Sequence, residues 1–231
     1  MSTKGRKSAT WKRVFPAMLV LAATLLVPYR ADAAESRVII PDFPSVRQWY
    51  SLSCEYAAAA AVTLYWGKLV SQRDFIREVP LSPNPHEGFR GNINKPFGGI
   101  TNYGIYAEPL VPVLESRGYD ATVYYGDLNR LKAELRAGHP VVVWFTSGQA
   151  PQPIYTRTYQ GESFRLVPHE HTVVAYGYDA NTIYLMDVGN GGFYHTAWSS
   201  FLRRWTYLQQ MYLVITPGAE MSRGPLTPPG V

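Results

Sequence analysis

The stretch Gln48-Trp49-Tyr50-Ser51-Leu52-Ser53-Cys54-Glu55-Tyr56-Ala57 contains the one cysteine of the chain and opens a run of five alanines, residues 57–61. Alanine is the strongest helix former, serine is a preferred N-cap, and glycine often follows the last helical turn. We therefore expect a helix over residues 54–66, with Ser53 as its cap and Gly67 past its end. The small side chains would let this helix pack closely against a sheet, with Cys54 in its first turn.

The regions around this helix predict a mixed arrangement of strands and helices. The run at 141–145 is apolar and β-branched, which is typical of a central strand. Residues 171–178 and 182–187 flank a turn at 179–181 and predict a hairpin. Residues 80–104 are rich in Pro, Gly and Asn and predict a long irregular loop. The other expected elements are strands at 37–41, 122–125, 193–195 and 207–215, and helices at 106–117, 128–137 (capped by Asp127) and 198–205.

The first 34 residues read as a targeting segment. A basic stretch at residues 4–13 precedes 16 uncharged residues, 14–29, and Ala31-Asp32-Ala33 has the small residues that a signal peptidase needs. We expect either a cleaved signal peptide or an N-terminal membrane anchor over residues 1–34. A folded domain would then span 35–216, followed by a disordered tail at 217–231. The domain is accordingly expected to be secreted or held at the extracytoplasmic cell surface.

The charge of the predicted domain argues against nucleic-acid binding. The formal charge of the chain is +5, but six of its 22 basic residues and one of its 17 acidic residues fall in the predicted leader. The rest of the chain is therefore balanced, at 16 against 16. One cysteine excludes an intramolecular disulfide, and its combination with scattered histidines has no zinc-type ligand spacing. We expect no metal and no cofactor.

An odd cysteine in an exported chain suggests a reactive thiol. At a helix N-terminus the unpaired N–H groups and the helix dipole favour a thiolate, and a nearby imidazolium adds to this effect. Gln48 lies six positions earlier, where its amide could join the Cys54 N–H in stabilising an oxyanion. The alternative for Cys54 is an ordinary buried small residue.

Two histidines on one predicted strand compete for the role of the base. His169 and His171 share a face because strand residues alternate. In a hairpin that turns at 179–181, His171 lies opposite residues 187–189, so Asp187 can orient its ring. We therefore predict His171 as the base, Asp187 as its partner and His169 as a rim residue.

The combined pattern resembles the papain-like cysteine peptidases related to the bacteriocin-leader (double-glycine) peptidases. The resemblance rests on Gln48-x5-Cys54, Gly138-His139-Pro140-Val141-Val142-Val143-Trp144, the stretch from His171 to Asp179, and Asp187. Gly88-Phe89-Arg90-Gly91 and Tyr103-Gly104 resemble the stand-alone exported branch of that family. The resemblance implies an α+β, papain-like fold in which a helical part packs on an antiparallel sheet. It also implies a nucleophile at Cys54, a base at His171, an orienting acid at Asp187 and an oxyanion donor at Gln48. Many relatives have Asp-Cys-Gly where this chain has Ser53-Cys54-Glu55.

We expect this chain to hydrolyse a peptide or protein substrate outside the cytoplasm through an acyl-enzyme on Cys54. Two alternatives stay open. One is a cell-wall peptidoglycan amidase or endopeptidase, and the other is a non-catalytic surface binding domain with the same fold. The sequence does not define the oligomeric state, and it assigns the membrane a role only through the N-terminal segment.

Overall fold

A computed structural model describes residues 36–149, 151–219 and 221 of the chain. The predicted leader and most of the predicted tail lie outside these residues. None of the helices in the described residues has the length and apolar character that a membrane crossing requires.

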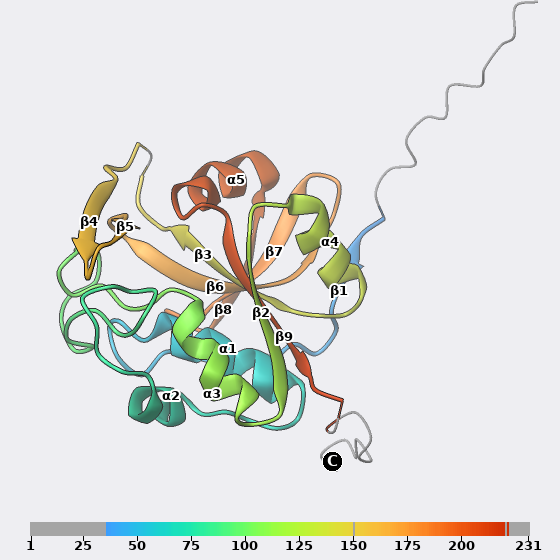
Figure 1. Cartoon of the computed structure of the whole chain (residues 1–231). Helices are drawn as coiled ribbons and strands as arrows, with labels where there is room; N and C mark the ends of the chain where they lie inside the picture. The colour runs from blue at the N-terminus through green and yellow to red at the C-terminus, as the bar shows by residue number, and fades with distance from the viewer. Residues whose placement is uncertain (1–35, 150, 220, 222–231) are drawn as a thin grey trace, which may run out of the picture. The chain divides into compact units, whose positions relative to one another are not determined.

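The centre of the fold is an antiparallel sheet of seven strands (Figure 1). Six of them follow the order β2-β9-β3-β6-β7-β8, and β1 extends the sheet by pairing with the far end of β6. A separate hairpin, β4-β5, stands beside this sheet. The strands are β1 (Val38–Ile39), β2 (Tyr119–Tyr125), β3 (Val141–Thr146), β4 (Tyr155–Tyr159), β5 (Glu162–Leu166), β6 (Glu170–Tyr178), β7 (Thr182–Asp187), β8 (Gly192–Ala197) and β9 (Met211–Pro217).

Helices cover both faces of the sheet. In Figure 1, α1, α2 and α3 lie below it, and α4 and α5 lie above it. The helices are α1 (Cys54–Tyr65), α2 (Gln72–Glu78), α3 (Val111–Glu115), α4 (Leu128–Arg136) and α5 (Trp198–Tyr207), with a 3-10 turn at Glu108–Leu110. The α+β, papain-like arrangement expected from the sequence is therefore confirmed, with helices on a second face as well.

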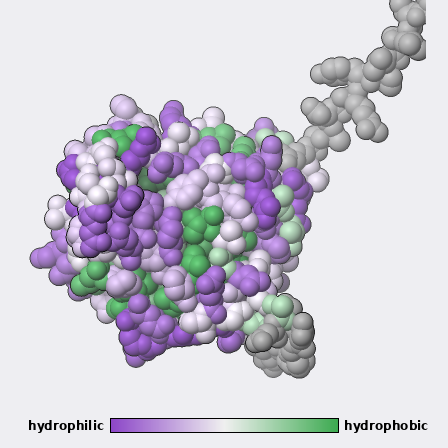
Figure 2. All heavy atoms as spheres, viewed as in Figure 1, coloured by the Kyte–Doolittle hydropathy of each residue, from purple (hydrophilic) through white to green (hydrophobic). Residues whose placement is uncertain are grey.

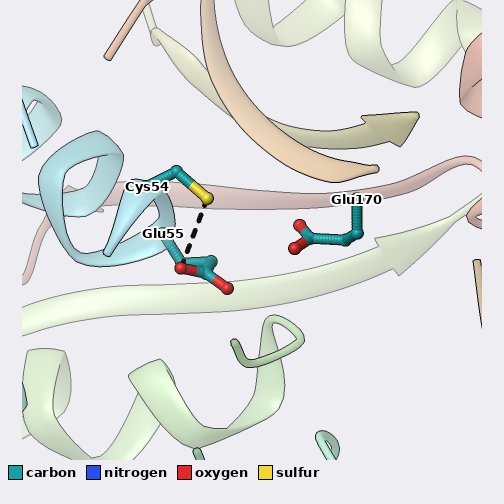
Figure 3. Close-up of side chains that lie close together, drawn as sticks. All are labelled: Cys54, Glu55 and Glu170. Carbon is teal, nitrogen blue, oxygen red and sulfur yellow. Dashed lines mark hydrogen bonds between the residues drawn. The ribbon is translucent and has the colours of Figure 1, made fainter. Parts of the chain in front are cut away.

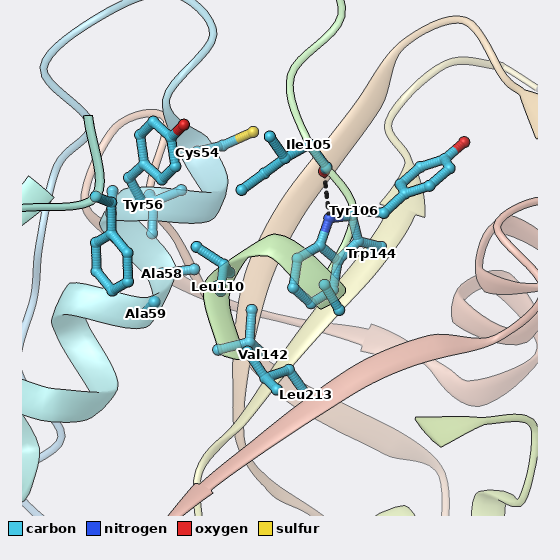
Figure 4. Close-up of a cluster of buried hydrophobic side chains, with 14 of the residues drawn as sticks. Cys54, Tyr56, Ala58, Ala59, Ile105, Tyr106, Leu110, Val142, Trp144 and Leu213 are labelled. Carbon is cyan, nitrogen blue, oxygen red and sulfur yellow. Dashed lines mark hydrogen bonds between the residues drawn. The ribbon is translucent and has the colours of Figure 1, made fainter. Parts of the chain in front are cut away.

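Strand alternation divides the core into two clusters. On β3, Val142 and Trp144 pack toward α1, whereas Val141 and Val143 pack toward α4 and α5. Figure 4 shows the α1 side, where small alanines of the helix approach the strands and the Trp144 indole donates a hydrogen bond of 3.0 Å to the Ile105 carbonyl. The alanine run therefore positions the first turn of α1 close to the central strands.

Several predicted elements agree with the structure. The helix at Cys54, the central strand at Val141–Thr146 and the β6–β7 hairpin are all present. Gly67 follows α1 with a φ of +82°, a left-handed conformation that favours glycine. The Asp127 carboxylate accepts a hydrogen bond of 2.9 Å from the Arg130 N–H, so it caps α4 as predicted.

Other expectations were wrong in detail. Ser53 stands at the N-cap position of α1 as expected, but its side chain makes no capping hydrogen bond, because its hydroxyl accepts from the Tyr50 N–H and donates to the Tyr50 carbonyl. The helix expected over 106–117 is broken into a 3-10 turn and the short α3, since Pro109 and Pro112 lack the N–H that a helix interior needs. Two elements have no predicted counterpart: α2, which begins with a Ser71–Asp74 capping box, and the polar β4-β5 hairpin.

The described residues on the face shown in Figure 2 form no broad apolar patch for a binding partner to cover. This face is mostly hydrophilic, and its apolar patches are small and separate. Scattered apolar residues of this kind are normal on soluble domains. The described features that carry chemistry lie instead around the start of α1 and the neighbouring ends of β6 and β7.

Candidate active site

The β6–β7 hairpin brings His171 and Asp187 together. Val173 is the register partner of Asp187, so His171 lies one diagonal step away on the same face. The His171 Nε2 atom is 2.7 Å from Asp187 Oδ1, which also accepts a hydrogen bond of 2.8 Å from the Gly189 N–H. Burial alone would raise the pKa of Asp187, but the His171 hydrogen bond, the His171 charge and the Gly189 amide hold it below its usual value.

The second histidine of this region has a different environment. His169 precedes β6 with a φ of +56°, and its ring lies edge-on to Phe97, with 5.8 Å between the ring centroids. Asp187 Oδ1 bonds to His171, so the carboxylate that the hairpin supplies orients His171 rather than His169.

Gln48 lies in the same cavity as this pair. Its backbone N–H donates a hydrogen bond of 2.8 Å to the Val188 carbonyl, which ties the loop before α1 to the end of β7. Its side-chain Nε2 donates to the Tyr50 carbonyl at 2.7 Å, and its Oε1 is buried without a partner. The cavity has a volume of about 400 Å³ and is lined by Gln48, Ser51, Phe97, Ser147, His171, Asp187, Gly189 and Asn190.

Cys54 does not line this cavity, although it follows the loop that does. Its side chain is only 4% exposed, and its thiol donates a hydrogen bond of 3.4 Å to Glu55 Oε2. Figure 3 shows the sulfur, the Glu55 carboxyl group and the Glu170 carboxyl group gathered together. Their ligand atoms all lie within 4.8 Å of one another, and all three residues are buried. The structure therefore brings Gln48, His171 and Asp187 together at one cavity. The Cys54 thiol points instead toward Glu55 and Glu170.

The electrostatic surroundings of the thiol are opposite to those expected from the sequence. Burial raises the pKa of Cys54 well above its usual value, and the neighbouring Glu55 and Glu170 raise it further. The Thr172 backbone hydrogen bond lowers it, but by less. In this conformation Cys54 is a protonated thiol, so the expected activated thiolate is not the state that the structure describes.

Strand alternation explains which side chains the sulfur meets. On β6, Glu170 and Thr172 share the α1 side with Val174, whereas His171 shares the opposite side with Val173. The inward sulfur of Cys54 therefore meets Glu170 and the Thr172 backbone. His171 instead meets Phe97 and Phe145 at ring-centroid distances of 5.9 and 6.0 Å.

Two acidic residues of this region were missed by the sequence analysis. Glu55 Oε1 accepts a hydrogen bond of 2.7 Å from the Ile105 N–H, and burial raises the pKa of Glu55 to about 7. Burial and the Glu55 charge raise the pKa of Glu170 well above its usual range. One signal was available in the sequence, namely Glu55 in place of the glycine that follows the cysteine in many relatives. Gly104 leaves room for the Glu55 carboxyl group, because a Cβ at residue 104 would overlap Glu55 Oε1.

The solved structures similar to this fold include two peptidase structures. One is a protein described as a C39-like peptidase of Bacillus anthracis, with 24% identity and a TM-score of 0.70 over 79% of this chain and 98% of that chain. The other is the peptidase domain of Streptococcus ComA, a bifunctional ABC transporter involved in a quorum-sensing pathway. It has 16% identity and a TM-score of 0.51 over 76% of this chain and 98% of that chain. No curated protein matches the chain.

The family itself is identified by a match that spans most of the described residues. The family model described as the Peptidase_C39 like family matches residues 40–213, which run from just after β1 into β9. This range includes helix α1 with Cys54, the β6–β7 hairpin with His171 and Asp187, and the loop before α1 in which Gln48 bonds to the end of that hairpin. The resemblance seen in the sequence is thereby confirmed: the chain belongs to the Peptidase_C39 like family and is a cysteine-type peptidase, a hydrolase.

Proposed function

We propose that this chain is an exported cysteine peptidase that hydrolyses peptide bonds with Cys54, His171, Asp187 and Gln48. The observation that carries this proposal is the cavity that Gln48 lines together with the hydrogen-bonded His171–Asp187 pair. Cys54 begins the helix that follows the loop containing Gln48. The export part of the proposal rests on the basic and apolar residues of the predicted leader, residues 1–34.

The thiol must turn before it can attack. A cysteine side chain has three staggered positions about its Cα–Cβ bond, and the structure has the one that points to Glu55. We propose that another position directs the sulfur into the cavity beside His171. There the sulfur leaves the carboxyl groups that raise its pKa and remains at the N-terminus of α1, whose dipole favours a thiolate. The inward thiol is then a resting state.

The hydrogen bond of His171 supports a proposal for the proton transfers. Its Nε2 is bound to Asp187, so Nδ1 is the ring nitrogen that takes the thiol proton. The thiolate forms a bond to the carbonyl carbon, and the oxyanion accepts hydrogen bonds from the Cys54 N–H and from the Gln48 Nε2 group. When the C–N bond breaks, His171 returns the proton to the departing amine. Water activated by His171 then hydrolyses the thioester and releases the acid.

A digest of a peptide library by the whole chain tests this proposal. We expect cleavage by the wild type, and loss of cleavage in Cys54→Ala and His171→Ala. His195→Ala is a matched control, since His195 is exposed on β8 and does not line the cavity. Equal cleavage by the wild type and Cys54→Ala would reject Cys54 as the nucleophile. Including peptidoglycan stem peptides in the library separates a general peptidase from a cell-wall enzyme.

A further inference from the structure

Two buried glutamates, Glu55 and Glu170, surround the inward-pointing Cys54 thiol, and the hydrolytic reaction proposed above does not require them. Cys54, Glu55 and Glu170 come from the start of α1 and the start of β6, and their ligand atoms lie within 4.8 Å of one another (Figure 3). Their exposed fractions are 4%, 1% and 4%, so water cannot solvate the three acidic groups. Buried acidic groups this close need a proton or a cation between them.

Each carboxyl group is anchored through one oxygen and leaves the other available. Glu55 Oε1 accepts from the Ile105 N–H at 2.7 Å, while its Oε2 lies 3.4 Å from the Cys54 sulfur. Glu170 Oε1 accepts from the Thr172 hydroxyl at 3.3 Å, while its Oε2 is buried without any hydrogen-bond partner. Metal ligands in proteins are typically oriented by such outer hydrogen bonds. The unpartnered oxygen is the observation that distinguishes this group from an ordinary acidic cluster.

Among the described residues, no basic side chain pairs with the carboxyl groups of this cluster. In the described part of the chain, no salt bridge joins Glu55 or Glu170 to a lysine, arginine or histidine. Glu55 and Glu170 are the charged neighbours with the largest effect on the Cys54 thiol, and both disfavour the thiolate. A divalent cation would reverse this effect, because it stabilises the thiolate and both carboxylates together.

We propose that Cys54, Glu55 and Glu170 bind one Zn²⁺ ion. A thiolate ligand selects zinc over the hard ions Mg²⁺ and Ca²⁺. The Cys54 sulfur and one oxygen from each of the two carboxylates would occupy three of the four positions around a zinc ion. Zinc binds sulfur at about 2.3 Å and carboxylate oxygen at about 2.0–2.2 Å. Small side-chain movements within the observed group are enough to reach these lengths. A water molecule would occupy the fourth position.

Zinc binding changes the protonation of the group and fixes the thiol. The Cys54 thiol loses its proton to solvent, as does any proton held between the carboxyl groups, and no redox change occurs. A sulfur bound to zinc on the Glu55 side cannot turn into the cavity beside His171. Zinc is therefore expected to hold the resting state and inhibit cleavage, a consequence that rests on the function proposed above.

Cobalt titration of the whole chain tests the site without using activity. Co²⁺ replaces Zn²⁺ in such sites, and its bond to a thiolate gives a sulfur-to-cobalt charge-transfer absorption in the near ultraviolet. We expect this absorption to saturate at one Co²⁺ per chain and to disappear when Zn²⁺ is added. The wild-type titration does not depend on whether any variant folds, and the same titration of Cys54→Ser shows whether the sulfur is the ligand. Absence of the absorption, or its persistence in Cys54→Ser, would overturn the proposal.

Competition between the protein and a zinc-binding dye tests the carboxylate ligands. Glu170→Gln keeps the size of the side chain and removes its charge, so we expect zinc affinity to fall by roughly 10- to 100-fold or more. Glu162→Gln is the matched control, because Glu162 is exposed on β5. Equal zinc affinities of the wild type and Glu170→Gln would exclude Glu170 as a ligand. If the chain binds zinc but cleaves nothing even in the presence of a chelator, only the function proposed above is refuted; if it cleaves but binds no zinc, only the metal site is refuted.

Discussion

Glu55 is expected to make the stability of this protein depend on pH between about 4.5 and 7. The carboxyl group is fully inside the protein beside the Cys54 sulfur, and burial raises its pKa from 4.5 to about 7. The folded state therefore holds a proton that the unfolded state releases as the pH rises through this range. Because the unfolded state binds fewer protons there, the free energy of unfolding must fall with rising pH.

The magnitude follows from the size of the pKa change. Each unit of pKa corresponds to about 1.4 kcal/mol, so the rise to about 7 represents about 3 kcal/mol. The stability associated with the protonated Glu55 is fully present below pH 4.5 and is lost by the time the pH has passed 7. Glu55→Gln keeps the acceptor for the Ile105 N–H and removes the ionisation. Relative to the wild type, the variant should gain about 3 kcal/mol between pH 4.5 and 8.

Urea unfolding at several pH values measures this difference directly. The whole chain is unfolded in the presence of a chelator, so that no metal stabilises the carboxylates. Subtracting the wild-type curve from that of Glu55→Gln cancels the titration of distant groups. The exposed control Glu162→Gln should follow the wild type at every pH. If the curves of Glu55→Gln and wild type run parallel from pH 4.5 to 8, the pKa of Glu55 is not raised and the reasoning fails.

Three further predictions concern the same region. Asp187→Ala should lower kcat far more than it changes KM, because the His171 ring loses the acceptor that fixes its tautomer. A kcat equal to that of the wild type would contradict this role. Gly104→Ala should destabilise the fold by about 1–3 kcal/mol or more, because residue 104 has a φ of +116° and an alanine Cβ there would meet Glu55. Thermal unfolding measures this loss, and an unchanged Tm would count against it. Cys54 in the resting enzyme should react with iodoacetamide at pH 6 more slowly than the same residue in urea-unfolded chain; equal rates would show that the thiol is not sheltered.

The positions of His171 and Asp187 were predictable because a short hairpin fixes its own register. Counting from a turn at 179–181 pairs Val173 with Asp187, as the structure does. Next to the turn the register differs by one residue, with Tyr178 opposite Ile183, and the irregularity between Ala175 and Gly177 restores the counted pairing. The helix at Cys54 was predictable for a similar reason, since five alanines and a following glycine define it locally. Local patterns were sufficient wherever the partners lie close in the sequence.

The direction of the Cys54 side chain could not be predicted in this way. It depends on Glu170, which is far along the chain, and on which face of β6 meets α1. Residue alternation shows that Glu170 and His171 point to opposite sides, but it does not show which side the helix covers. The proline-broken segment before β2 is a smaller case. A helical pattern there concealed two residues that cannot donate in a helix interior.

Glu55, the residue after Cys54, links the start of α1 to the core of the fold. Glu55 Oε1 binds the Ile105 N–H, the Ile105 carbonyl accepts from the Trp144 indole, and Gly104 leaves room for the Glu55 carboxyl group. Relatives with glycine after the cysteine lack the side chain that makes the first of these contacts. Glu55 and Gly104 are therefore expected to form a matched pair. The Glu55 carboxyl group holds the Gly104–Ile105 segment in place through the Ile105 N–H, and the Cys54 thiol rests beside the same carboxyl group. The conformation of this segment and that of the thiol therefore both depend on Glu55.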